Sequence, residues 1–242
     1  MLNDSLFILE PNITAKDMAS AIGSIASILK DKDIITDNGY SSLLDIQSQL
    51  KAFKNNKYWF MSVDIDRPIE FEIIDKVLKE KDPVSVILSS EKISIDLNNE
   101  FPFINLDVCV VIRNMDEEPI SRWHFDLANQ NEEGVMQPGP LTHLQYGGHN
   151  SGNREYDHPL KIPRWCHPPM DIILLCEAIV ANFFPEKWDL IKDNPSWCHA
   201  IAESQKICYS AYLYKMIKSL GLSSTTILQE MDAKSWNQKM KA

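Results

Sequence analysis

Residues 103–127, FINLDVCVVIRNMDEEPISRWHFDL, decide the fold. Two runs in this stretch, Phe103–Ile112 and Ile120–Leu127, are rich in β-branched and aromatic residues, which indicates strands. The short segment Asn114–Glu118 joins them, and strands so close in sequence pair antiparallel. Three further segments of the same character extend the pattern on both sides: Val84–Leu88, Ile93–Leu97 and Leu141–Tyr146. The sequence therefore predicts an antiparallel meander of four to five strands.

Helical patterns flank this meander. In the first 90 residues we expect a helix capped at Thr14, a second from Ser41 or Ser42 after a break at Gly39, and a third from Pro68. After the sheet we expect a central helix following Asp171, another that begins at Asn194-Pro195 and ends at Gly221, and a last one capped by Ser223 or Ser224. The prediction is an α+β fold in which the meander packs against N-terminal and C-terminal helices. Residues 1–90 form an N-terminal helical part, and residues 91–242 form the meander and C-terminal helical part of the same compact unit.

Composition limits the function. The chain has 242 residues, 44% of them hydrophobic, and a net charge of −10, so it can bury a full core and is a poor general nucleic-acid binder. The N-terminus lacks the basic region of a signal peptide, and the apolar run at 172–181 is too short to span a bilayer. The five cysteines include no CxxC pair, as expected for reduced thiols. We expect a cytoplasmic protein with no membrane association.

Polar chemistry concentrates between His124 and His167, which hold five of the six histidines. Strand alternation in Ile120–Leu127 places Arg122, His124 and Asp126 on one face and Trp123, Phe125 and Leu127 on the other. A row of guanidinium, imidazole and carboxylate can orient a phosphate, relay a proton or bind a metal. A solvated outer face of the sheet is the alternative that the pattern leaves open.

The loop histidines extend this candidate site. His143, His149 and His158 can join His124 and Asp126 as ligands of a divalent ion, although the spacings match no compact zinc motif. Our candidate catalytic residues are His124, Asp126 and His143, and our candidate ligand-binding residues are Arg122, Tyr146 and Arg164. No cofactor is predicted, and a divalent metal ion is the alternative.

The order of elements resembles the ubiquitin-conjugating enzyme fold over residues 93–218 at most. The resemblance is carried by the antiparallel meander, a histidine-containing flap, and the entry Trp165-Cys166-His167-Pro168-Pro169 into a helix. That family has its nucleophilic cysteine in the flap before the tryptophan, but no cysteine occurs between Cys109 and Cys166. The resemblance thus implies a degenerate relative that has lost thioester activity.

Three functions follow as expectations. The first is a non-catalytic binding or assembly subunit of a bacterial multi-protein system, including an anti-phage one, with another protein subunit as partner. The second is a metal-dependent hydrolase or nuclease that uses the histidines and Asp126 and holds a phosphate with Arg122 or Arg164. The third is a nucleotide or small-ligand sensor in which Trp123, Tyr146 and Trp165 stack on a base. The sequence does not decide whether the protein is an enzyme.

Overall fold

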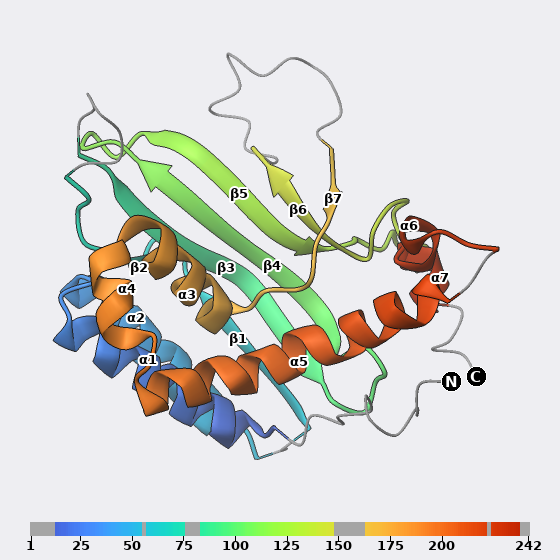
Figure 1. Ribbon diagram of the computed structural model, residues 1–242, viewed down its shortest axis with the longest axis horizontal. Helices are drawn as coiled ribbons and strands as arrows, with labels where there is room; N and C mark the ends of the chain where they lie inside the picture. Colours follow the sequence, from blue (N-terminus) through green and yellow to red (C-terminus); the bar gives the residue numbers. More distant parts are fainter. Residues whose placement is uncertain (1–12, 55–56, 76–82, 148–162, 222–223, 238–242) are drawn as a thin grey trace.

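In the part of the chain that the structure describes, seven antiparallel strands form one sheet, and a layer of helices covers one of its faces (Figure 1). The structure, a computed structural model, describes residues 13–54, 57–75, 83–147, 163–221 and 224–237. This arrangement confirms the predicted α+β class with helices flanking an antiparallel sheet.

The order of strands across the sheet is β1-β3-β4-β5-β6-β7, and β2 pairs with β3 beside this path. The strands are β1 (Tyr58–Val63), β2 (Ile69–Glu70), β3 (Ser85–Asp96), β4 (Phe103–Arg113), β5 (Pro119–Leu127), β6 (Thr142–Tyr146) and β7 (Trp165–Cys166). Neighbours from β3 to β7 are consecutive in the chain, so this part of the sheet is a meander, with β1 added at its other edge.

The helices come from both ends of the chain. They are α1 (Ala15–Asp31), α2 (Asp37–Lys51), α3 (Ile172–Phe183), α4 (Pro185–Ile191), α5 (Pro195–Leu220), α6 (Ile227–Glu230) and α7 (Ala233–Asn237). Helix α1 begins at a capping box, in which Thr14 and Asp17 bond to each other's backbone N–H groups. The N-terminal helix α1 packs against both α2 and the long C-terminal α5, and the core is continuous between them.

The sheet has one apolar face and one polar face. Side chains such as Trp59, Ile93, Val108 and Phe125 are buried on the helix side and belong to the hydrophobic core. The alternate positions of the same strands lie on the opposite, outer face, as the period of two requires. Among the described residues, no helix is long and apolar enough to cross a membrane.

Two predictions in the first 90 residues are wrong. No helix begins at Pro68: Ile69–Glu70 is a strand that pairs with β3, and Ile74 bridges to Val84, whereas residues 76–82 lie outside the described part. The strand β1 is absent from the prediction and occupies an edge of the sheet. Isoleucine and phenylalanine at helical spacing fit a short buried strand equally well, and pairing with β3 decides between the two.

Other boundaries also differ. Gly39 lies inside α2 and does not break it, because Thr36 caps this helix by accepting a hydrogen bond from Gly39 N–H. Position 39 is a glycine because a Cβ atom there would lie 2.3 Å from the Glu70 carbonyl oxygen. The predicted strands Val84–Leu88 and Ile93–Leu97 are one strand, β3, which a bulge next to Ser90 bends but does not break. The last predicted helix is divided into the short helices α6 and α7.

Candidate functional site

Asp107, His124 and Asp126 converge on the outer face of the sheet. One potential ligand atom from each residue lies within 4.8 Å of the other two, which makes this the only metal-ligand group of three or more within the described residues. An ion with ordinary bonds to oxygen and nitrogen brings its ligand atoms within about 4 Å of one another. Small side-chain rotations therefore suffice to complete a three-ligand site.

Strand register causes this convergence. Asp107 of β4 lies directly opposite Asp126 of β5, and Cys109 lies directly opposite His124. Directly opposed residues on one face of an antiparallel pair have Cβ atoms about 5 Å apart. The two carboxyl groups therefore face each other across the strands, with the imidazole of His124 two residues along β5.

The two carboxyl groups are held in an unfavourable setting for negative charge. Burial raises the pKa of Asp126 to about 7, and the facing Asp107 carboxylate adds to this effect. Burial also raises the pKa of Asp107, with a contribution from Glu91. Among the described residues, Asp126 Oδ1 is shielded from solvent and has no hydrogen-bond partner. A cation between these groups would supply the missing compensation.

The imidazole of His124 is suited to act as a neutral ligand. Burial lowers the pKa of His124, and the positive charge of Arg122 lowers it further. Its Nε2 lies 3.7 Å from Cys109 Sγ. Burial raises the pKa of the Cys109 thiol to about 12, so that group is a protonated neighbour and not a nucleophile at neutral pH.

Positive charge approaches the site from two sides. Arg122 acts on His124 and Cys109, whereas Arg164, which directly precedes β7, acts on Asp126 and His143. Both arginines are predicted ligand-binding residues, and the structure places Arg164 near Asp126 and Arg122 near His124. Guanidinium groups beside a bound cation are a typical arrangement for holding a phosphate.

The third predicted catalytic residue, His143, lies beside the three-ligand group but not in it. His143 is on β6 directly opposite Asp126, and its side chain is only 4% exposed. Burial lowers its pKa to about 4, with Arg164 contributing, so the ring is neutral at pH 7. His143 Nδ1 has no partner among the described residues. A neutral buried imidazole opposite Asp126 can orient the Asp126 carboxylate.

The remaining candidates lie elsewhere. Tyr146 is on the opposite face of the sheet, where its ring meets that of Trp123 at 6.3 Å, and it does not approach the acidic pair. His149 and His158 lie outside the described residues.

Asp107 is the residue that the sequence analysis missed. The apolar positions Leu106, Val108 and Val110 identify one face of β4 from sequence, so Asp107 and Cys109 must share the other face. That signal was present in the sequence. The register that brings Asp107 opposite Asp126 depends on the five-residue turn at 114–118, which the alternation within one strand does not reveal.

Comparisons with known proteins add no assignment. No family model, no curated protein and no solved structure matches the chain. The resemblance to ubiquitin-conjugating enzymes thus stays a prediction.

Proposed function

We propose that the protein is a metal-dependent hydrolase of phosphate esters, with Asp107, His124 and Asp126 as ligands of a divalent cation. The observation that carries the proposal is the convergence of three potential ligand atoms within 4.8 Å. It is supported by the solvent-shielded Asp126 Oδ1, which no described residue bonds. The donor set of two carboxylates and one imidazole is compatible with Zn²⁺, Mn²⁺ or Mg²⁺.

The flanking arginines favour a phosphate-bearing substrate. Arg122 and Arg164 come from the two ends of the candidate site and act electrostatically on its members. A bound divalent cation supplies an activated water and polarises a phosphoryl oxygen. The guanidinium groups would then hold the non-bridging oxygens and stabilise the charge that builds up in the transition state. His143, which is neutral and next to Asp126, is placed to orient that carboxylate.

Metal binding is the first test. Isothermal titration with Mn²⁺ and Zn²⁺ should show one site per chain, and Asp107→Asn should weaken it at least about tenfold, because outer partners alone change affinity by that amount. The matched control is Asp116→Asn, which removes the same charge from the exposed turn before β5. Equal metal affinity in the two variants would contradict the proposed ligands.

Activity is the second test. Hydrolysis of bis(p-nitrophenyl) phosphate and p-nitrophenyl phosphate should require the cation and should fall about a hundredfold or more in Asp126→Asn and His124→Gln. A metal-loaded wild-type protein with no turnover on either ester would limit the site to cation binding.

A protein-binding subunit is the second candidate, and an exposed aromatic group favours it. Three aromatic side chains on the neighbouring strands β5, β6 and β7 are strongly exposed: Trp123 (42%), Tyr146 (57%) and Trp165 (66%). Large exposed aromatics of this kind are typical of protein interfaces. A partner captured from the source organism should be lost with Trp165→Ser and kept with Asp107→Asn. If both variants lose the partner, or if neither does, these aromatic side chains are not the binding surface.

The partner's identity, the cytoplasmic location and a role in a bacterial anti-phage system stay predictions. The structure contributes one related finding, namely the absence of a membrane-spanning helix among the described residues.

A further inference from the structure

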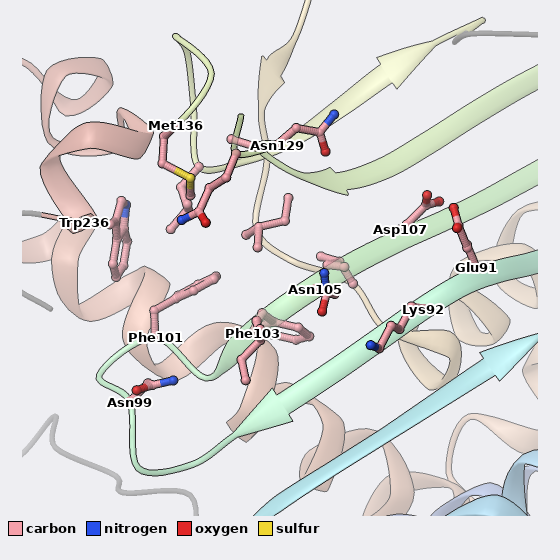
Figure 2. A pocket seen from close by; sticks show the side chains of 16 residues that line it. Glu91, Lys92, Asn99, Phe101, Phe103, Asn105, Asp107, Asn129, Met136 and Trp236 are labelled. Atoms are coloured by element: carbon pink, nitrogen blue, oxygen red, sulfur yellow. The ribbon is translucent and has the colours of Figure 1, made fainter. Parts of the chain in front are cut away.

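A cleft of about 870 Å³ begins at Asp107 and runs away from the three-ligand site. The hairpin between β3 and β4 forms its floor, and residues 127–141 and α7 form its other walls (Figure 2). This volume lies within the range of small-molecule binding sites. Asp107 belongs both to the cleft and to the candidate metal site, so a ligand in the cleft reaches the metal ligands.

The end of the cleft distant from Asp107 is an aromatic wall. Figure 2 shows Phe101, Phe103, Met136 and Trp236 gathered there. The ring centroids of Phe101 and Trp236 are 4.9 Å apart, and those of Phe101 and Phe103 are 5.7 Å apart. The Lys215 ammonium lies 4.0 Å from the centre of the Trp236 ring and holds α7 against the long helix α5. The four side chains of the wall are only 3–7% exposed and belong to the hydrophobic core, so the wall is rigid and apolar.

Polar groups occupy the rest of the cleft. Lys92 and Asn105 lie between the aromatic wall and Asp107, and Glu91 lies next to Asp107 (Figure 2). Lys92 is the register partner of Asp107 and is exposed, with its ammonium 5.6 Å from the centre of the Phe60 ring of β1. Because the lysine stem is flexible, this ammonium can turn from Phe60 toward a phosphate in the cleft. Amide side chains on the cleft lining, such as Asn99 and Asn129, offer both donors and acceptors. From one end of the cleft to the other, the lining is thus first aromatic, then amide and ammonium groups, and finally the carboxylates of the candidate metal site.

We propose that this cleft binds a nucleotide, with the base against the aromatic wall and the phosphates between Lys92 and the cation. The proposal rests on the proposed metal-dependent function and names its substrate class. Phe103 and Asp107 are four residues apart on β4, a span of about 13 Å that the bulge at Ile104 shortens. A nucleoside with an extended di- or triphosphate chain matches that length, whereas a single-ring phosphate ester does not fill it.

The same features disfavour longer ligands. A net charge of −10 opposes the phosphates of a nucleic-acid chain, whereas one cation and one ammonium group are enough for a free nucleotide. The amides can pair with the polar edge of a base, and bases stack on aromatic rings regardless of their identity. The structure thus assigns a mononucleotide pocket and leaves the base to be measured.

Calorimetry with three probes tests the assignment. These are non-hydrolysable analogues of the four nucleoside triphosphates with Mn²⁺, inorganic tripolyphosphate with Mn²⁺, and the free nucleosides in EDTA. At least one analogue should bind about tenfold more tightly than tripolyphosphate, at the lower end of what base stacking contributes. Asn105→Trp, which fills the middle of the cleft from an exposed strand position, should remove this advantage and leave Mn²⁺ affinity unchanged. Ile120→Trp, at an exposed position of β5 outside the lining, is the control.

The outcomes separate the two proposals. Equal affinity for tripolyphosphate and for all four analogues would overturn the nucleotide pocket, even where Mn²⁺ binds as expected. Absence of Mn²⁺ binding would overturn the metal-dependent function. In that case, the cleft would still be a nucleoside-binding site if nucleosides bind in EDTA, if Asn105→Trp abolishes this binding and if Ile120→Trp retains it.

Discussion

Replacing Asp126 by asparagine should stabilise the metal-free protein at alkaline pH while abolishing its response to metal. Asp126 faces Asp107 across β4 and β5, and one of its oxygens is shielded from solvent without a partner among the described residues. An amide of the same shape carries no charge, so the cost of burying a carboxylate disappears. A gain in stability combined with a loss of function is typical of a binding site that is strained in its empty state.

The size of the effect follows from the pKa. Burial raises the pKa of Asp126 from 3.8 to about 7, so the folded protein holds this proton more tightly than the unfolded chain does. The wild type therefore loses stability as pH rises from about 4 through 7, and the loss is complete near pH 8. Three pKa units correspond to about 4 kcal/mol. Because the side chain keeps some contact with water, we expect about half of this, roughly 2 kcal/mol.

Urea denaturation at pH 5 and pH 8 in EDTA measures the difference. Asp126→Asn should be more stable than wild type by roughly 2 kcal/mol at pH 8 and by less at pH 5, where the wild-type carboxyl is protonated. Asp116→Asn, which removes an exposed carboxylate, should match wild type at both values. Addition of Mn²⁺ should raise the stability of the wild type and of Asp116→Asn, but not that of Asp126→Asn.

The opposite sign would refute this reasoning. If Asp126→Asn is less stable than wild type at pH 8, then the carboxylate is compensated in its ionised form, with Arg164 as the nearest identified source of positive charge. In that case Asp126 and Arg164 form a structural ion pair, and the case for a cation is lost.

Three further predictions concern the site and the scaffold. Metal affinity should fall about tenfold per pH unit below pH 7, because the cation displaces a proton from a carboxyl of raised pKa; a dissociation constant that calorimetry finds constant from pH 6 to 8 would contradict this. Asp171→Ala should cost about 2 to 3 kcal/mol in urea denaturation, because Asp171 caps α3 and accepts a 2.6 Å bond from the buried hydroxyl of Ser204; a loss below 1 kcal/mol would mean that water replaces both bonds. Gly39→Ala should lower stability by about 2 kcal/mol because its methyl group meets the backbone of Glu70, whereas Gly23→Ala, which meets a flexible side chain, should lose less in the same thermal scan.

The sequence predicted the sheet where alternation and turn residues agree. The strands β4, β5 and β6 were expected to within two residues, because apolar residues at every second position lie between polar turns. The same reasoning failed for Ile69–Glu70, since a two-residue strand contains too few positions to show a period. It also divided β3 at the polar residues beside its bulge, because a bulge resembles a turn in sequence.

The candidate site was predicted in part, for a physical reason. Alternation within β5 is a local property, so it placed Arg122, His124 and Asp126 on one face without knowledge of the fold. The contribution of Asp107 is non-local, because it requires the register between β4 and β5. The number of residues in the connecting turn sets that register. A shift of the pairing by one residue would place Asp107 on the other face of the sheet.

The burial of the site argues against the alternative of a plain solvated sheet face. On such a face the carboxylates of Asp107 and Asp126 would stay apart and hydrated, with ordinary pKa values. Instead they face each other, burial raises both pKa values, and one oxygen is shielded from water. A proton, an arginine or a cation can compensate this charge. If a shared proton compensates the charge, Asp126→Asn should change the free energy of unfolding little at pH 5, and metal should not bind. If an arginine compensates it, Asp126→Asn should destabilise the protein at pH 8. Only a bound cation accounts for a rise in stability with Mn²⁺ in the wild type that is lost when Asp126 is replaced by asparagine.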